Sequence, residues 1–148
     1  MRFTCDTNEL NTALSIVSRA LAVRSTKPIL EGILFESCDE GLRLTCTDLA
    51  LGIETLLPAT FSEEGRAVLP GKLLCEIIRK LPDDTVSISV DSSFKVSIRG
   101  GISSFSITAM SSEDYPELPE VDSEKGIQLP QNQLKAMIGG TSFAVSEN

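Results

Sequence analysis

The sequence repeats one pattern of secondary structure, and this repeat restricts the possible folds more than any other feature. A short alternating segment precedes an amphipathic helix, and a meander of three strand-like segments follows. The second copy begins roughly 65 residues after the first, and a third begins roughly 60 residues later. Strands that follow one another in a meander pair antiparallel. The repeat therefore predicts an α+β fold with a duplicated βαβββ unit, in which two helices pack on antiparallel sheets.

The first copy opens with an alternating segment at Arg2–Cys5, and Asp6 follows with a side chain typical of a helix start. Apolar residues then recur at spacings of three and four, which predicts a helix over residues 7–21. Pro28 disfavours helical geometry in the residue before it, so a loop that carries Arg24 and Lys27 should follow the helix. The predicted strands of this copy are residues 29–36, 42–47 and 51–57.

The second copy begins at Ala67–Leu69, after a predicted polar loop over residues 61–65. Pro70 is suited to open a helix, and apolar residues continue at helical spacing as far as Leu81. Val, Ile and Phe then alternate with Ser and Lys in three segments, which indicates strands with one face in water. These strands are predicted over residues 86–90, 94–98 and 104–108.

The third copy is incomplete, because residues 126–138 repeat the strand, Pro and helix pattern of residues 66–78 but no strands follow. The acids and prolines of residues 111–124 suit an extended solvated segment. We predict an N-terminal domain over residues 1–120, an acidic linker over 121–126, and the truncated first strand and helix of a second domain over 127–148. The polypeptide should thus be a piece of a longer repeating protein.

Several classes of chemistry lack the residues they need. The sequence has no His, and its four Cys, at positions 5, 38, 46 and 75, form no metal-binding motif. We interpret them as small buried thiols. Nucleotide-binding, hydrolase and metalloprotease motifs do not occur. We therefore expect no catalytic residue, no metal and no cofactor. No apolar run approaches the roughly 20 residues that span a bilayer, so we expect a soluble cytoplasmic protein without a membrane partner.

The distribution of charge is more informative than its sum. The net charge is −8, yet many basic residues lie on or just after the predicted helices, while most acids lie in loops and strands. Such a pattern is typical of a solvated helix face, and it also suits a surface that attracts phosphates without reading sequence. The pattern alone leaves both interpretations open. The basic residues are Arg19, Arg24, Lys27, Lys72, Arg79, Lys80 and Lys135.

Five parts of the sequence, taken in order, match a known family. They are Met1–Thr4, Arg24–Leu30, Leu44–Leu49, Val68–Pro82 and Phe105–Ile107 with Asp114–Pro116. Together they resemble the N-terminal domain of the bacterial DNA polymerase III beta subunit, the beta sliding clamp family. A further segment, Gln128–Phe143, resembles the start of the second domain of that family. The resemblance implies a DNA-clamp fold with three domains per subunit, and a homodimeric ring with helices around its hole.

The resemblance also implies a function. A member of this family is a non-catalytic processivity factor that encircles duplex DNA without sequence preference and tethers the replicative polymerase. DNA polymerase III and the clamp loader would bind through domains that this polypeptide lacks. By position, Arg24 and Lys72 match DNA-contacting residues, and the predicted DNA-binding set also includes Lys27 and Arg79.

Two neighbouring apolar residues match the subunit interface of the family. They are Phe105 and Ile107, which would face the third domain of the other subunit; the alternative is that they are ordinary core residues of a strand. Two other functions stay open. One is a protein-interaction module that uses an exposed sheet edge and has no DNA role. The other is a small-molecule enzyme on an α+β scaffold, which would need a catalytic constellation that the residues do not supply.

Overall fold

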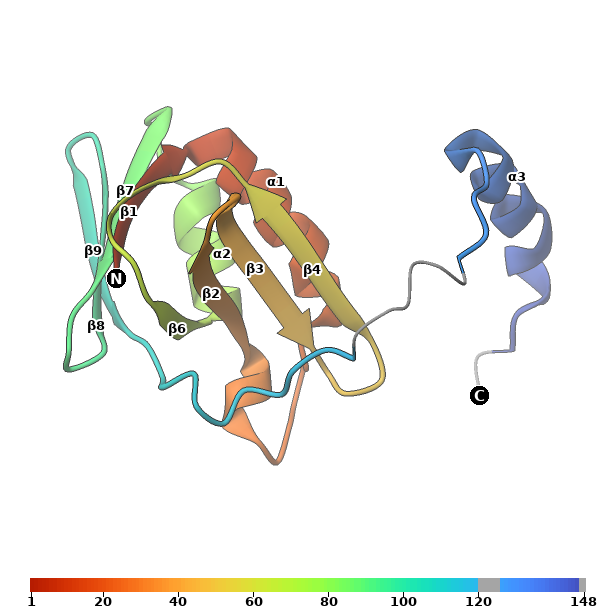
Figure 1. Cartoon of the computed structure of the whole chain (residues 1–148), viewed down its shortest axis with the longest axis horizontal. Coiled ribbons are helices and arrows are strands. Elements are labelled where there is room, and N and C mark those ends of the chain that lie inside the picture. Colours follow the sequence, from red (N-terminus) through yellow and green to blue (C-terminus); the bar gives the residue numbers. More distant parts are fainter. Residues whose placement is uncertain (120–125, 147–148) are drawn as a thin grey trace. The chain divides into compact units, whose positions relative to one another are not determined.

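A computed structural model describes residues 1–119 and 126–146. The chain divides into two compact units, Met1–Leu118 and Pro119–Asn148, and we treat each by itself (Figure 1). The first unit contains two antiparallel sheets and two α-helices, which confirms the predicted α+β fold.

The nine strands of the first unit form a five-stranded sheet in the order β5-β1-β7-β8-β9 and a four-stranded sheet in the order β4-β3-β2-β6. Every neighbouring pair is antiparallel. We call them the first and second sheet. The strands are β1 (Arg2–Asp6), β2 (Gly32–Cys38), β3 (Gly41–Thr47), β4 (Gly52–Leu57), β5 (Thr60–Glu63), β6 (Arg66–Pro70), β7 (Thr85–Val90), β8 (Lys95–Gly100) and β9 (Ser103–Thr108).

The helices α1 (Thr7–Val17) and α2 (Gly71–Arg79) each follow the first strand of their repeat directly. Asp6 caps α1, because its Oδ1 accepts hydrogen bonds from the backbone N–H groups of Asn8 (2.8 Å) and Glu9 (2.9 Å). The two helices bury matching positions. The buried residues are Thr7, Leu10, Ala13, Leu14 and Val17 in α1, and Gly71, Leu74, Ile77 and Ile78 in α2.

The two repeats exchange their first strands. β1 pairs with β7 of the second repeat, and β6 pairs with β2 of the first repeat. The registers match as well, because the last residue of each exchanged strand lies opposite the first residue of its partner: Asp6 opposite Thr85, and Pro70 opposite Gly32. The duplication predicted from the sequence is therefore present, and its two copies form one domain.

A second pairing also repeats. After its fourth and last strand, each repeat returns to its own first strand: β5 pairs with β1, and Met110 forms a bridge with Val68 of β6 through hydrogen bonds of 2.8 and 3.1 Å. The prediction of a polar loop over residues 61–65 is wrong for residues 61–63, which belong to β5. Phe61 explains the error, because its ring packs on that of Phe3, 5.6 Å away between centroids, and gives this polar segment an apolar anchor.

Two element boundaries differ from those predicted by three residues or more. The first helix ends at Val17 and continues as a 3₁₀ turn, η1 (Ser18–Ala20), not as an α-helix to residue 21. The strand predicted from residue 29 begins at Gly32, because Pro28–Glu31 forms a second 3₁₀ turn, η2. Apolar residues continue through both turns and mask these changes of geometry in the sequence pattern.

The core lies between the helices and the inner faces of both sheets. It includes the buried aromatic rings of Phe3 and Phe35, whose centroids are 6.2 Å apart. Cys5 and Cys46 are buried in it, while Cys38 and Cys75 are half-buried, and all four thiols are free. Burial raises the pKa of Cys5 to about 12 and that of Cys46 to about 12. The interpretation of these two cysteines as buried thiols is confirmed.

After β9 the chain crosses the outer face of the second sheet, and we call Met110–Leu118 the strap (Figure 1). Tyr115 is buried, with its hydroxyl oxygen 3.3 Å from the Gly32 carbonyl oxygen and 3.2 Å from that of Thr45. Leu118 packs over Gly52, where any Cβ would collide with it. The prediction of an extended solvated segment over residues 111–124 is therefore wrong for the strap, because Tyr115 and Leu118 pack on the sheet.

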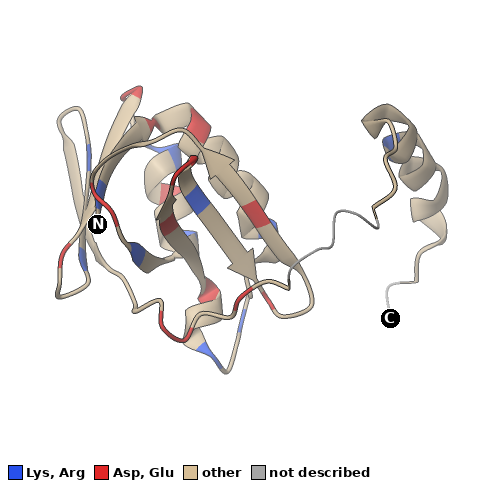
Figure 2. Ribbon diagram, viewed as in Figure 1, with Lys and Arg blue, Asp and Glu red and all other residues tan. Residues whose placement is uncertain are grey.

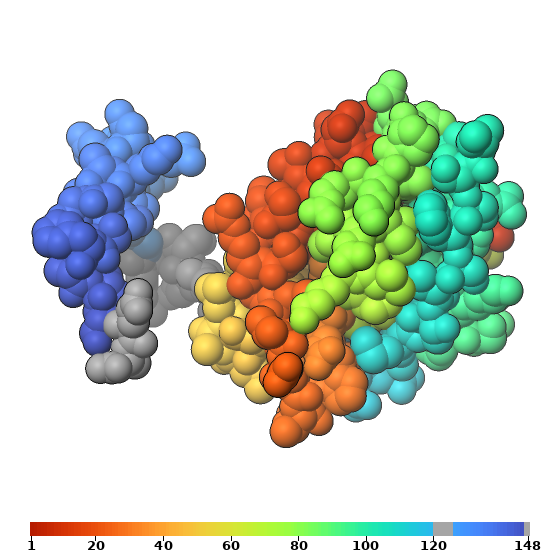
Figure 3. Space-filling view, turned by 180° about the vertical axis from the view of Figure 1, so that it is seen from behind, coloured from red at the N-terminus to blue at the C-terminus, as the bar shows by residue number. Residues whose placement is uncertain are grey.

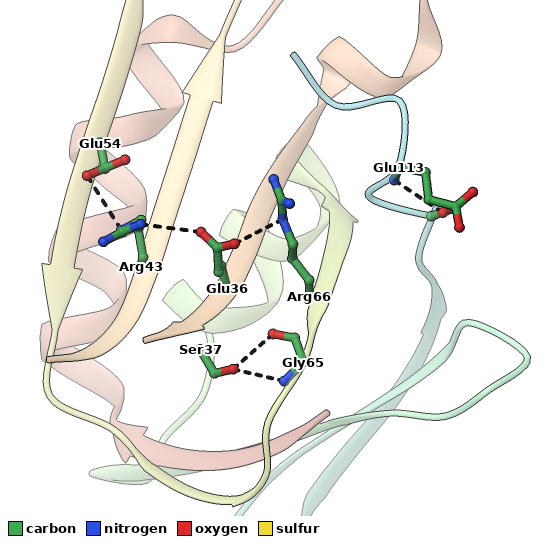
Figure 4. A network of polar contacts seen from close by, with 8 residues as sticks. Glu36, Ser37, Arg43, Glu54, Gly65, Arg66 and Glu113 are labelled. Carbon is green, nitrogen blue, oxygen red and sulfur yellow. Dashed lines mark hydrogen bonds and ion pairs between the residues drawn. The ribbon is translucent and has the colours of Figure 1, made fainter. Parts of the chain in front are cut away.

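The rest of that outer face carries a row of ion pairs (Figure 4). Glu36 lies between two arginines, with its carboxylate 3.0 Å from Arg66 Nε and 3.5 Å from Arg43 Nη1. Arg43 Nε is also 3.6 Å from Glu54. Each of these side chains is partly exposed, so the individual pairs add little stability. They do neutralise one another, and the outer face of the second sheet consequently has no net charge in this row.

The second unit contains α3 (Gln131–Thr141) and a 3₁₀ turn, η4 (Ser142–Ala144). The predicted helix is present, but residues 127–130 form no strand, which corrects that part of the prediction. The matching strands β1 and β6 each pair with a strand of another repeat, and a lone segment has no such partner. Most of the acidic linker predicted over residues 121–126 lies outside the described residues.

Truncation of the Tyr115 side chain should destabilise the domain strongly. Tyr115→Ala removes a buried ring from the strap and should lower the free energy of unfolding by about 3–5 kcal/mol. Tyr115→Phe keeps the ring, loses one hydrogen bond, and should cost about 1 kcal/mol. Urea unfolding followed by far-UV circular dichroism measures both. Glu113→Ala, an exposed change in the same strap, is the control and should stay within about 0.5 kcal/mol. Equal losses from all three variants would contradict a packed strap.

The buried thiols predict a loss of stability in alkali. Thiols of the unfolded chain ionise near their ordinary pKa of 9.0, whereas Cys5 and Cys46 stay protonated in the folded protein until about pH 12. Their contribution is therefore complete below pH 9 and decreases as the pH rises toward 12. Urea unfolding between pH 8 and 11 should show this decrease, and the Cys5→Ala/Cys46→Ala double variant should show a shallower one. An identical slope in the double variant would sink the explanation.

Candidate nucleic-acid interface

The two helices contact each other and lie side by side on one face of the domain (Figure 3). The connection between α1 and β2, residues 18–31, lies at the end of the pair and contains η1 and η2. The corresponding connection in the second repeat, between α2 and β7, is only residues 80–84. The duplicated domain is therefore asymmetric at this point, and the longer connection carries Arg24 and Lys27.

We call the exposed basic residues of α2, of its C-cap and of the connection the basic face. All six are exposed, and none forms an ion pair with another residue of the described part of the chain. The helices and the connection carry three acids, Glu9, Glu31 and Glu76, and Asp83 and Asp84 follow Lys80, so cations outnumber acids here although the chain has a net charge of −8. Figure 2 shows two basic segments on the connection. The basic face consists of Arg19, Arg24, Lys27, Lys72, Arg79 and Lys80.

The structure brings the connection and α2 together. Lys72 Nζ donates a hydrogen bond of 3.4 Å to the Val23 carbonyl oxygen, although the two residues are far apart in the sequence. An open groove of about 320 Å³ lies between the connection and α2. Predicted residues Lys72 and Arg79 line this groove, while Arg24 and Lys27 lie on the connection beside it. The groove is lined by Ser18, Leu21, Val23, Lys72, Cys75, Glu76 and Arg79.

The first turn of α2 is suited to bind an anion, although its residues do not stabilise the helix end. Pro70 offers no side-chain cap, the first turn has no acid, and Lys72 places a positive charge at the positive end of the helix dipole. In α1, Asp6 stands at the position of Pro70 and caps the helix, and Asn8 stands at the position of Lys72. The first turn of α1 also contains an acid, Glu9. The positive potential at the start of α2 is thus left uncompensated and would attract an anion such as a phosphate.

Half-buried Cys75 lies between the two cations of the groove. Burial raises the pKa of this thiol, and the nearby Arg79 opposes the shift. Its position suits packing, not nucleophilic chemistry. Across residues 1–119 and 126–146, no three acidic or cysteine side chains gather closely enough to hold a metal ion. Within the same residues, the helices are too short or too polar to cross a bilayer.

The predicted interface residues lie on an edge strand. β9 ends the first sheet, and Phe105 and Ile107 lie opposite the buried Ile98 and Val96 of β8. Phe105 is 40% exposed, whereas Ile107 is only partly exposed and packs against the core. β9 contains no charged residue and no proline, the usual guards of an exposed edge. An edge strand without charged residues or proline, and with an exposed apolar side chain, is suited to pair with another strand.

The sequence offered no signal for two residues of the groove. Ser18 lies in the 3₁₀ turn after α1, and Val23 is an exposed apolar residue of the connection. Only the packing of the connection against α2 brings them to Lys72.

Two strand-exchanged βαβββ repeats with both helices on one face define the class of DNA-clamp domains. A family model described as DNA polymerase III beta subunit, N-terminal domain, matches residues 1–119. The chain belongs to this family.

Relatives and solved structures agree with this assignment. The beta sliding clamp of Synechococcus elongatus is 38% identical over 149 residues, and that of Bacillus subtilis is 34% identical over 154 residues; each alignment covers 99% of this chain. The crystal structure of a putative DNA polymerase III beta subunit from Eubacterium rectale matches with a TM-score of 0.94 at 37% identity. That of the Bacillus subtilis sliding clamp matches with a TM-score of 0.95 at 33% identity. Both structural matches cover 100% of this chain.

The chain is shorter than these proteins. It spans 40% of the Synechococcus relative and 41% of the Bacillus relative, and it covers similar shares of the two solved chains.

Proposed function

We propose that this polypeptide is the N-terminal part of a DNA replication processivity factor, a sliding clamp subunit that encircles duplex DNA and tethers the replicative polymerase. The observation that carries the proposal is the basic face: six exposed cations on α2, at its C-cap and on the connection, in a strongly acidic chain that belongs to a clamp family. In this function the basic face lines the hole of a ring. Arg24, Lys27, Lys72 and Arg79 contact phosphates of the DNA backbone.

The chemistry of the basic face suits sliding. Lysine and arginine attract phosphates at long range, and this attraction has no sequence preference. The side chains are exposed and long, and no aromatic residue lies among them to stack on bases. A clamp must move along DNA without falling into a deep energy minimum, and contacts to base edges would create such minima. A diffuse set of cations gives attraction with a nearly flat energy profile along the duplex.

The β9 edge supplies the other requirement, ring closure. We assign Phe105 and Ile107 to the interface with a second subunit, where β9 would pair with an edge strand of the partner. Head-to-tail contacts of this kind close into a ring when the rotation between subunits allows it. We further propose that the partner surface, and the surfaces that bind DNA polymerase III and the clamp loader, belong to the other domains of the family's full-length subunit. The role is non-catalytic and needs no cofactor.

Charge reversal on the basic face tests the DNA role. Titration of the ¹⁵N-labelled chain with a 16-base-pair duplex in low salt should shift amide signals of α2 and of the connection, with weak affinity because a single domain cannot encircle DNA. Arg24→Glu with Lys27→Glu should weaken binding about tenfold, and the dependence of affinity on salt should become less steep. Lys95→Glu, an exposed change on β8 of the first sheet, is the matched control. An equal effect of the control would contradict a localised DNA surface.

Polar substitution at the β9 edge tests the ring. A chimera in which residues 1–119 replace the matching domain of the Bacillus subtilis clamp should form a dimer in solution. Phe105→Arg with Ile107→Asp should raise its dissociation constant at least about tenfold, since buried apolar anchors carry much of an interface energy. Leu73→Arg, at an exposed position on α2, should leave the dimer intact. A dimer that tolerates both edge substitutions would rule out the assignment, provided that circular dichroism shows the variant folded.

The exposed β9 edge also favours a second candidate, a protein-interaction module without a DNA role. The two candidates give different results in the duplex titration. A module of this kind would show no amide shifts on the basic face at any salt concentration, while the edge variant would still lose its protein partner.

A further inference from the structure

The tip of the connection, Val23–Lys27, is a small closed loop. Its base is fixed by a hydrogen bond of 3.2 Å from the Ala22 N–H to the Leu30 carbonyl. Within it, the Lys27 N–H donates to Ser25 Oγ (3.1 Å), and the Ser25 N–H lies 3.4 Å from a carboxylate oxygen of Glu31. These hydrogen bonds join residues of the connection to one another and stabilise the conformation of the loop. They do not fix its direction relative to the helices.

The contact that reaches the tip from α2 is the hydrogen bond from Lys72 Nζ to the Val23 carbonyl. The neighbouring residue, Gly71, is packed so closely against the base of the connection that an added Cβ would lie 2.7 Å from a methyl group of Leu21. The base of the connection is therefore seated on the first turn of α2. Lys72 extends the same attachment from the base to the tip, and the accepting carbonyl directly precedes Arg24.

We infer that Lys72 is a positioning residue, which holds the tip against α2 and thereby presents Arg24 and Lys27 on the same surface as Arg79. This inference rests on the proposed function and assigns Lys72 a role other than simple phosphate contact. The cations of the tip and of α2 repel one another, and this repulsion pushes the tip outward. A hydrogen bond from the ammonium group to a carbonyl opposes that motion.

A first experiment examines the loop without any DNA. Lys72→Met keeps most of the length of the side chain but cannot donate to the Val23 carbonyl. Amide ¹⁵N relaxation of the 148-residue chain should show lower order parameters at residues 23–27 in this variant. Lys80→Met, which removes an equal charge at the other end of α2, should leave those order parameters unchanged. Unchanged loop dynamics in Lys72→Met would overturn the inference, whatever the result with DNA.

A second experiment measures coupling with the 16-base-pair duplex. Lys72→Met should weaken binding about fivefold when Arg24 and Lys27 are present, but less than about twofold in a chain that already carries Arg24→Ala and Lys27→Ala. Equal losses in both backgrounds would mean an independent phosphate contact and would refute the positioning role. If Arg24→Ala with Lys27→Ala has no effect by itself, the proposed DNA function fails instead, and the relaxation experiment still decides whether Lys72 holds the loop.

Discussion

The exchange of first strands between the two repeats is the interaction on which the rest of this domain depends. β1 completes the sheet of the second repeat, and β6 completes the sheet of the first. Each helix begins where its exchanged strand ends, and α1 and α2 contact each other on one face of the domain. Neither repeat has a complete sheet without the other. One core therefore serves both repeats, and the strand that precedes each helix is held by backbone hydrogen bonds to the other repeat.

This symmetric scaffold carries an asymmetric surface. The second repeat joins α2 to β7 through residues 80–84, while the first joins α1 to β2 through the longer connection with Arg24 and Lys27. The beginnings of the helices differ in the same sense, because Asp6 caps α1 and no acid compensates Lys72 in α2. Positive charge thus accumulates where the long connection meets the uncapped helix. The two repeats share the same fold, and the proposed binding surface lies where they differ, at the connection and the start of α2.

Charged side chains are paired on the outer face of the second sheet and unpaired on the basic face. On the outer face of the second sheet, Arg43 and Arg66 are paired with glutamates, and the strap covers the apolar remainder. On the basic face the cations stay exposed and form no ion pairs among the described residues. Paired arginines contribute to the surface of a folded protein without attracting a polyanion. Unpaired cations keep a positive electrostatic potential, which attracts the phosphates of DNA without fixing the DNA in one position.

The repeat, both helices of the first unit and most of its strands could be predicted from the amino-acid sequence, because apolar periodicity is visible in a short window of residues. The sequence also assigned Arg24, Lys27, Lys72 and Arg79 to helices or loops. Four features could not be predicted in this way: the strand exchange, the edge position of Phe105, the burial of Tyr115 in an acidic segment and the approach of Lys72 to Val23. Each of these depends on which distant segments pack together. That choice is made by the shared core as a whole, so no local pattern around the individual residues encodes it.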